Sequence, residues 1–293
     1  MSIKRANQPP NLRALMKRID NLAHGTGRPV RRVQRAVANT VVGQMLPPSV
    51  VKGGTAMKLR IGEARSRFTP DFDASRSDTI TLDDYLDQLG DLLAEGWSRF
   101  TGTVVVLDSP QPEGVPNEYV MRPFEIKLAY SSQHWLTVTF ELGRDEIGST
   151  KNQDFRVAPD IVEMFEILGL DRPAPIPVLA VDHQVAQKLH ACTTVNSRDG
   201  RNERAHDLVD LHLLAQDEPM DMAAVAATST RLFLARKTLT SQASSRRPTT
   251  RSSDLVRVVL TDHQRRPSDR LDAGQWLVGE FGHPSEAALG VIS

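Results

Sequence analysis

The sequence VKGGTAMKLRIGEARSRFTPDFDASR occupies residues 51–76 and carries two short motifs in a fixed order. The first is Gly53-Gly54-Thr55, at the beginning of a segment that can form a helix. Glycine lacks a Cβ, so the backbone N–H groups of such a turn can lie directly against an anion. The first N–H groups of a helix are also unpaired, and the positive end of its dipole lies there. The motif therefore predicts a turn that binds phosphate.

The second motif is Asp71-Phe72-Asp73. Alternate side chains of an extended strand project from one face, so Asp71 and Asp73 share a face while Phe72 points into the core. Paired carboxylates suit Mg²⁺, which also keeps water and substrate phosphate oxygens. In this order the two motifs predict a site for a nucleoside triphosphate and a divalent metal, at which the α-phosphate is attacked. Gly53-Gly54 is not followed by Gly-Lys-Ser/Thr, which excludes a P-loop, and the Rossmann glycine fingerprint is absent.

The composition is that of an ordinary globular protein. The 293 residues suffice for one large domain or two smaller ones, and 36 Lys plus Arg balance 36 Asp plus Glu, so net charge neither favours nor excludes nucleic acid. The one cysteine, Cys192, excludes an internal disulfide and is typical of a reducing compartment. The N-terminal residues lack a signal-peptide core, and no apolar run is long enough to span a membrane. We expect a soluble cytoplasmic protein.

Hydrophobic periodicity predicts helices first, strands in the middle and helices again towards the end. The expected helices are residues 11–25, 29–46, a segment that begins near Thr55, 81–95, 182–195, 203–215 and 223–237. The expected strands are residues 49–51, the Asp71–Asp73 segment, 103–107, 119–130 and 135–142, with loops at 109–117, 131–133 and 198–203. Thr81 and Asp182 are expected N-caps. A proline-rich link at 172–180 is expected to separate two lobes.

A third carboxylate is expected beside the Asp-x-Asp pair. In the strand WLTVTFEL, residues 135–142, alternation places Glu141 on the same face as Thr137 and Thr139. If this strand neighbours the one that carries Asp71 and Asp73, Glu141 completes a carboxylate trio.

Two of the later helices carry charges near their apolar faces. Lys188 is three residues after Val185 and four before Cys192, so it borders an apolar stripe. Asp207 and Asp210 are three residues apart on the next helix, and Arg204 precedes Asp207 by the same spacing. Taken alone, this spacing is also typical of an exposed ion pair within one helix.

Together the motifs resemble the AbiEii/MenT family of nucleotidyltransferase-like toxins. The likeness rests on GGT followed by DFD, the strand with Glu141, QKLHA at 187–191 and RAHDLVDL at 204–211, and it covers residues 10–240. It implies an α+β fold, with a polymerase-β-like nucleotidyltransferase core (a mixed sheet flanked by helices) and a mainly helical C-terminal lobe. It also implies a bacterial toxin–antitoxin operon with a separately encoded cognate antitoxin. The MenT branch adds nucleotides, chiefly pyrimidines, to the 3′ end of tRNA, so that aminoacylation and translation stop.

The resemblance also divides the chain into three parts. We expect a nucleotidyltransferase core with N-terminal helices at residues 1–172, a helical lobe with KLHA and RAHDLVDL at 173–240, and a divergent, loosely structured tail at 241–293. Relatives continue past the position of Arg236 with helical, aromatic-containing sequence, and the tail here does not share that pattern. A monomer is expected.

Carried over residue by residue, the family motifs assign roles to positions in this chain. The nucleotide-binding positions are Lys52, Gly53, Gly54, Thr55 and Lys188. The metal ligands are Asp71 and Asp73, with Glu141 as the third; the catalytic positions are Asp71, Asp73, Glu141, Lys188 and Asp210. Thr69 stands where relatives often carry serine, and we expect its hydroxyl to be exposed and a target of inhibitory phosphorylation.

Phosphoryl transfer of this class implies two Mg²⁺ ions and a nucleoside triphosphate substrate. Glu141 would bind the metal on the side of the nucleophile or take the proton of the attacking 3′-hydroxyl, and both roles stay open. Lys188 would neutralise the leaving pyrophosphate, and Asp210 would orient Lys188 or the base. Four arginines at the start of the second helix are expected to contact an RNA backbone. The alternative is that they form a solvated helix face. These residues are Arg28, Arg31, Arg32 and Arg35.

Three other hypotheses remain. The same fold can transfer a nucleotide onto a protein or small-molecule hydroxyl. A non-catalytic module that binds RNA or a partner would need neither Mg²⁺ nor Asp71. A zinc site from His190, Cys192, His206 and His212 is disfavoured, because His190 and Cys192 point to different sides of their helix.

Overall fold

The computed structural model describes residues 7–110, 120–194 and 204–243. The helices are α1 (Leu12–Thr26), α2 (Val30–Gln44), α3 (Gly53–Ile61), α4 (Leu82–Glu95), α5 (Pro159–Leu168), α6 (Val181–Thr193), α7 (Ala205–Asp217) and α8 (Met222–Ala243). The strands are β1 (Ser49–Lys52), β2 (Phe72–Arg76), β3 (Phe100–Val106), β4 (Arg122–Tyr130), β5 (Gln133–Arg144), β6 (Gln153–Arg156) and β7 (Ile176–Leu179).

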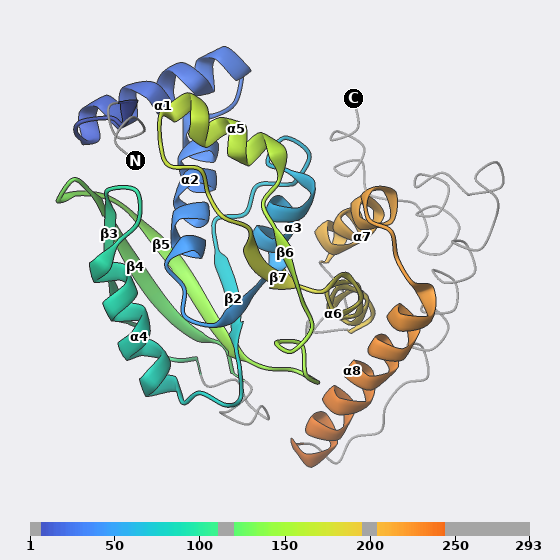
Figure 1. The fold of residues 1–293 in the computed structure, drawn as a ribbon. Coiled ribbons are helices and arrows are strands. Elements are labelled where there is room, and N and C mark those ends of the chain that lie inside the picture. The colour runs from blue at the N-terminus through green and yellow to red at the C-terminus, as the bar shows by residue number, and fades with distance from the viewer. Residues whose placement is uncertain (1–6, 111–119, 195–203, 244–293) are drawn as a thin grey trace, which may run out of the picture.

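The seven strands form one mixed sheet in the order β3-β4-β5-β2-β1-β7-β6. Strand β2 runs parallel to β5, and β1 runs parallel to β7. The other neighbouring strands are antiparallel. Figure 1 shows α1, α2 and α5 on one side of the molecule, α4 along β3, and α6, α7 and α8 together at the other end. The expected α+β fold, a mixed sheet flanked by helices, is confirmed.

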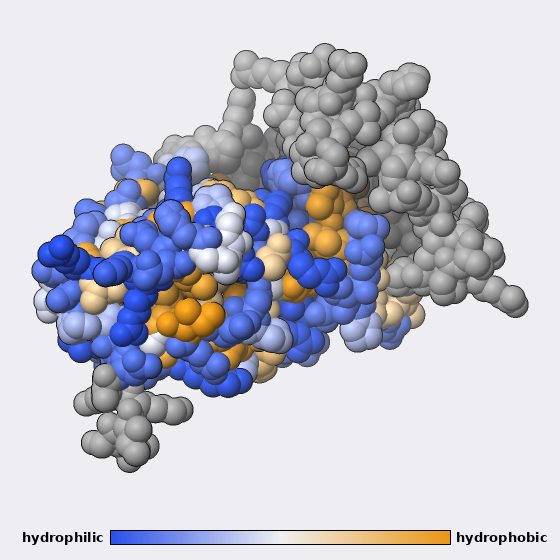
Figure 2. Space-filling view, turned by 90° about the horizontal axis from the view of Figure 1, so that it is seen from above, coloured by the Kyte–Doolittle hydropathy of each residue, from blue (hydrophilic) through white to orange (hydrophobic). Residues whose placement is uncertain are grey.

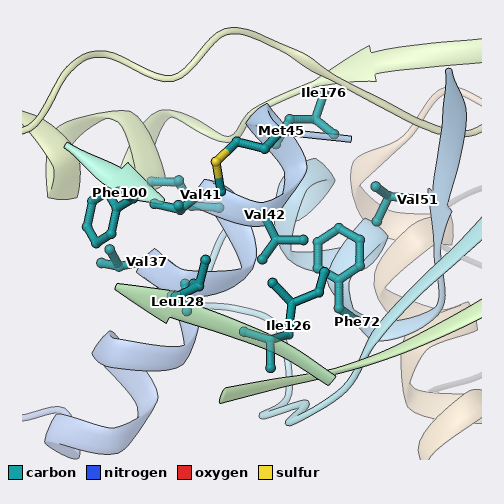
Figure 3. Packing of buried hydrophobic residues seen from close by; sticks show 14 of the residues in the cluster. Val37, Val41, Val42, Met45, Val51, Phe72, Phe100, Ile126, Leu128 and Ile176 are labelled. Atoms are coloured by element: carbon teal, nitrogen blue, oxygen red, sulfur yellow. The ribbon is translucent and has the colours of Figure 1, made fainter. Parts of the chain in front are cut away.

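Helix α2 supplies much of the main hydrophobic core. Its apolar stripe of Val33, Val37 and Val41 is fully buried, as the periodicity predicts. Figure 3 shows Val42 of α2 facing Phe72 of β2 and Ile126 of β4, and Val37 on the side of Phe100 of β3 and Leu128 of β4. Phe72 therefore anchors β2 in the core, which leaves the alternate residues of β2 on the other face.

Several local signals act as the sequence predicts. The Thr81 hydroxyl accepts a hydrogen bond from the Asp84 backbone N–H, 3.1 Å away, and caps α4. The hairpin between β4 and β5 turns at Ser131 and Ser132, which have positive φ angles of 48° and 65°. Two consecutive residues with positive φ match the right-handed twist of the flanking strands.

Two expectations are wrong, one about the proline-rich segment at 172–180 and one about Asp182. The proline-rich segment contains β7, which lies in the sheet between β1 and β6, so the chain leaves the sheet only at α6. Ile176 and Val178 are buried there, and proline's restricted φ is compatible with an extended strand. Asp182 is not an N-cap, since α6 begins at Val181; its carboxylate instead accepts a hydrogen bond from Thr228 of α8, at 2.6 Å.

The C-terminal helices share a second, smaller core. It contains Val185 and Leu189 of α6, Leu214 of α7, Val225 of α8 and Met57 of α3. Since α3 also packs against β1, β2 and β7, this helix belongs to both cores. The helical lobe is thus seated directly on the helix that begins with the Gly-Gly turn.

Arg60, near the end of α3, joins the lobe to the sheet through a fully buried guanidinium. It pairs with Asp154 of β6 at 2.7 Å and with Glu218, next to α7, at 3.2 Å. It also donates to the Leu179 carbonyl of β7, at 2.7 Å, and to Gln184 of α6, at 3.3 Å. Four other segments, β6, β7, α6 and the one after α7, therefore converge on this one side chain of α3.

The loop expected at 109–117 lies largely outside the described residues, and the loop expected at 198–203 lies wholly outside them. Of the tail expected at 241–293, only residues 241–243 are described, and they belong to α8. Among the helices that are described, none combines the length and the apolar character that crossing a bilayer requires.

We predict that Arg60→Leu lowers the free energy of unfolding by about 3–5 kcal/mol, because the partly buried Asp154 loses its cation and the buried Leu179 carbonyl and Gln184 lose their donor. The matched control is Arg172→Leu, since Arg172 pairs with Glu166 at 3.1 Å on the surface. That change should cost less than about 1 kcal/mol. Urea unfolding of both variants tests this, and equal costs would contradict the role given to Arg60.

Candidate active site

Asp73 lies between a cation and a second carboxylate on neighbouring strands. Lys52 of β1 is its partner on one side, and Glu141 of β5 is its partner on the other. Residues directly opposite on adjacent strands point to the same face of a sheet. The buried neighbours Phe72 and Ala74 occupy the other face. The structure thus brings Asp73 and Glu141 together across β2 and β5.

The Gly-Gly turn lies against this group. Gly53 has a φ of 62°, and a Cβ on it would occupy the position of the Asp73 Oδ2 atom. A Cβ on Gly54 would lie 2.8 Å from the Thr69 Cβ. Both positions therefore require glycine, the first for conformation and space, the second for space. Lys52 is the N-cap of α3 and its side chain makes no capping hydrogen bond, so the first N–H groups of α3 are available to an anion beside Asp73.

Thr55 holds the two motifs in place. Its buried hydroxyl donates to the Asp71 carbonyl at 3.0 Å and accepts from the Asn39 amide at 3.1 Å. This bond fixes the start of β2 over the first turn of α3. Because the hydroxyl is occupied, the backbone N–H is what Thr55 can offer to a phosphate.

Burial and the neighbouring charges both act on the ionisation of Asp73 and Lys52. Burial raises the pKa of Asp73 to about 6; the nearby Lys52 opposes this, and the charges of Glu141 and Asp71 add to it. Burial lowers the pKa of Lys52, against the charges of Glu146 and Asp73. A bound cation would relieve the repulsion among the three carboxylates.

These residues suit a hard divalent cation that arrives with its substrate. Asp71, Asp73 and Glu141 offer carboxylate oxygens, the ligands that Mg²⁺ prefers. Within residues 7–110, 120–194 and 204–243, no three His, Cys, Asp or Glu side chains are already arranged around a metal position, the zinc candidates included. Mg²⁺ commonly keeps waters and substrate phosphates in its shell, so the trio fits a shared metal–nucleotide site rather than a closed protein cage.

A second charged cluster joins α6 and α7. The Lys188 ammonium is 3.0 Å from Asp207 and 2.6 Å from Asp210, and all three side chains are almost completely buried. The alternative of an exposed ion pair within one helix is wrong for these aspartates, because their main partner comes from the neighbouring helix. A guanidinium from another segment, Arg67, also contacts Asp210 at 3.2 Å.

Three functional-site neighbours lie outside the sequence motifs. Arg67 belongs to the loop between α3 and β2. Glu146, just after β5, receives two hydrogen bonds from Arg236 of α8, at 3.0 and 2.8 Å, and one from Gln187 of α6, at 2.9 Å. Burial opposes ionisation of Glu146, but Arg236 outweighs it and, with Lys52 and Gln187, holds the pKa below its usual range. Of these three residues, only Arg67 lies near the sequence motifs, because it stands between Gly-Gly-Thr and Asp-x-Asp, two residues before Thr69.

The four arginines at and just before the start of α2 do not form one free surface. Arg32 binds Glu63 at 2.5 Å and also the Ser66 carbonyl, and so anchors the loop after α3. Arg35 donates to the Thr137 carbonyl of β5 at 3.1 Å. Burial lowers the pKa of Arg35, the charge of Arg31 adds to this, and Asp71 opposes it.

Arg28 is partly exposed and Arg31 is exposed. Arg31 and Arg35 therefore remain the candidates for contact with an RNA backbone on the side of the site next to Asp71.

The expected exposure of Thr69 is wrong. Its side chain is 5% exposed and packs against the backbone of Gly54. A kinase could reach this hydroxyl only after the loop between α3 and β2 had moved away from α3.

We predict that Gly53→Ala lowers stability by about 1–2 kcal/mol from the left-handed backbone alone, and displaces Asp73 as well. Nucleotide binding should be lost with it. Gly90→Ala is the control: Gly90 lies within α4, where an added Cβ meets open space, and alanine should stabilise by up to about 1 kcal/mol. The close approach of Gly53 to Asp73 would be refuted if Gly53→Ala had the stability and the nucleotide affinity of the unchanged protein.

We predict that Lys188→Met destabilises the protein by about 3–5 kcal/mol, since two buried aspartates lose their shared cation. Lys151→Met, at an exposed position, should stay within about 0.5 kcal/mol of the unchanged protein. Chemical unfolding measures both. A small effect at Lys188 would mean that the cluster is not a structural ion pair.

Comparison with protein families matches residues 40–276 to the nucleotidyl transferase AbiEii toxin of type IV toxin–antitoxin systems. The match continues past residue 240, where the apolar period of the sequence is lost. Comparison with curated protein sequences gives no match.

Among solved structures, MenT4, a nucleotidyltransferase toxin from Mycobacterium tuberculosis H37Rv, superimposes with a TM-score of 0.50 at 18% identity, over 92% of this chain and 85% of MenT4. JHP933 from Helicobacter pylori gives a TM-score of 0.38 at 14% identity, over 78% of this chain and 89% of its own. The MenT4 superposition shows the fold. The family match covers more than half of the sequence, and the chain therefore belongs to the AbiEii family of nucleotidyltransferase toxins.

Proposed function

We propose that this nucleotidyltransferase toxin transfers a nucleoside monophosphate from a pyrimidine nucleoside triphosphate to the 3′ end of tRNA, and so blocks aminoacylation and translation. The observation that carries the proposal is the contact between the Gly53 turn and the Asp73 carboxylate, with Glu141 opposite. It supports the proposal because a helix end that can offer N–H groups to phosphate lies beside carboxylates suited to a metal, as nucleotidyl transfer requires.

The nucleotide would lie over the start of α3. Backbone N–H groups of Gly54 and Thr55 would bind the β- and γ-phosphates. Asp71, Asp73 and Glu141 would hold Mg²⁺, as two ions in the family's usual arrangement. When bound, the metal neutralises phosphate charge and clamps the attacking and leaving oxygens.

The acceptor's terminal 3′-hydroxyl oxygen forms a bond to the α-phosphorus, and the bond from that phosphorus to the oxygen that bridges to the β-phosphate breaks. Pyrophosphate leaves. The hydroxyl proton would pass to Glu141 if this carboxylate is the base, or to water if Glu141 binds the metal on the side of the nucleophile. Asp210 and Asp207 stay with Lys188, where they orient this cation rather than bind metal.

The arginines next to Asp71 support a polynucleotide acceptor. Arg35 has hydrogen-bonding capacity left after its bond to Thr137, and Arg31 is exposed beside it. Phosphate neutralisation by such residues dominates affinity for nucleic acid. The choice of tRNA and of a pyrimidine nucleotide rests on the resemblance to the MenT branch.

The family implies a cognate antitoxin, and we propose a monomeric toxin. On the face that Figure 2 shows, the apolar residues of the described chain form small, separate patches among hydrophilic ones. Stable homodimers usually bury larger continuous apolar surfaces.

We predict that Asp73→Asn lowers label transfer from [α-³²P]CTP to tRNA by at least about 10²-fold, because it removes charge that must hold the metal. Its stability should not fall: burial raises the pKa of Asp73, so the folded state favours a neutral side chain at this position. Asp78→Asn is the control, since Asp78 pairs with Arg144 on the surface beyond β2. It should transfer label normally.

The same assay decides between acceptors. Incubation with tRNA, cell protein and small metabolites, followed by separation of these fractions, shows which one gains label. Label in the protein or small-molecule fraction alone would reject the tRNA assignment. Transfer that persists in Asp73→Asn would reject the site itself.

A further inference from the structure

Arg67 combines a fixed anchor with free hydrogen-bonding capacity. Its Nε donates to the Oδ2 atom of Asp210 at 3.2 Å. Its Nη1 and Nη2 atoms make no hydrogen bond with the part of the chain that the structure describes. The Arg67 side chain is 31% exposed, whereas Asp210 is fully buried and Lys188 nearly so. Solvent and substrate can therefore reach Arg67 at Asp210, whereas the more exposed Arg204 and His206 contact Asp207.

Arg67 is a second cation at Asp210. Lys188 carries one positive charge against the two negative charges of Asp207 and Asp210, Arg204 lies 3.9 Å from Asp207, and Arg67 pairs with Asp210. Arg67 and Lys188 both bind the Oδ2 atom of Asp210. The direction of the guanidinium is therefore set by helices α6 and α7 before any substrate binds, and its ordering costs little entropy on binding.

The backbone on which Arg67 lies leads directly to the Gly-Gly turn. Thr69, two residues later, packs against Gly54, and the Asp71 carbonyl is bonded to Thr55. The charge of Arg67 also opposes the rise in the pKa of Asp73. Arg67 consequently lies between the buried Lys188 cluster and the carboxylates of the active site.

Building on the proposed function, we propose that Arg67 is a substrate-binding residue that contacts the triphosphate of the nucleotide bound at the start of α3. Lys188 and Asp210 act as its positioning residues. Two of the three N–H groups of Lys188 are committed to buried aspartates, which leaves the exposed fork of Arg67 as the cation that meets the phosphates. A guanidinium can give two parallel N–H groups to phosphate oxygens, a geometry that lysine lacks.

This role predicts a dependence on the number of phosphates. We expect Arg67→Ala to weaken binding of a non-hydrolysable CTP analogue by roughly 10- to 100-fold, as expected for a lost charge-assisted contact. Binding of CMP, which lacks the β- and γ-phosphates, should be unchanged. In the transfer assay the KM for CTP should rise more than kcat falls. Arg67→Lys should recover only part of the affinity, because it keeps the charge and loses the fork.

Arg65→Ala is the matched control. Arg65 belongs to the same loop and pairs with Asp217 of α7 at 2.8 Å, but its side chain is 53% exposed and its partner is remote from Lys188. Its affinity for the CTP analogue should equal that of the unchanged protein.

Isothermal titration with the two ligands separates the outcomes. Equal losses for the CTP analogue and CMP in Arg67→Ala would indicate a merely structural role and overturn the proposal, as would a variant that behaves like Arg65→Ala. If the unchanged protein transfers no label to any acceptor, yet Arg67→Ala still loses triphosphate binding selectively, the proposed function fails while the role of Arg67 stands.

Discussion

The buried guanidinium of Arg60 is the contact on which the arrangement of this molecule depends. It lies near one end of α3 and binds groups from β6, β7, α6 and the segment after α7. With this end of α3 fixed, the direction of its other end is fixed too. That other end is the Gly-Gly turn against Asp73. A single short helix thereby aligns the sheet, the helical lobe and the anion-binding backbone.

The parts of the site that the sequence predicts are those set by local rules. The alternation of Asp71, Phe72 and Asp73 determines which side chains face the core, and burial of Phe72 follows. The alternation of β5 places Glu141 on the face of the sheet opposite to Phe72, and parallel pairing with β2 brings Glu141 next to Asp73. Both the Gly-Gly turn and the Thr81 cap follow from requirements of a helix N-terminus.

The remaining parts depend on contacts between distant segments, which leave no period in the sequence. The Thr55 hydroxyl, which the motif alone would offer to phosphate, is bonded to the Asp71 carbonyl. Thr69, on the same segment, is buried. The prolines of β7 have the sequence signature of a linker, because a short buried strand that contains proline shows no distinguishing period. Glu146 and Arg236 are 90 residues apart and belong to no motif, so only the folded chain reveals that α8 reaches the site.

The position of Arg236 has a consequence for synthesis of the protein. During translation the glycine turn and the strand carboxylates leave the ribosome long before α8 does. Until α8 emerges, the segment after β5 lacks the partners that Arg231 and Arg236 provide, and the surroundings of Lys52 are incomplete. The surroundings of Lys52 are therefore completed only when nearly all of the described chain has been synthesised.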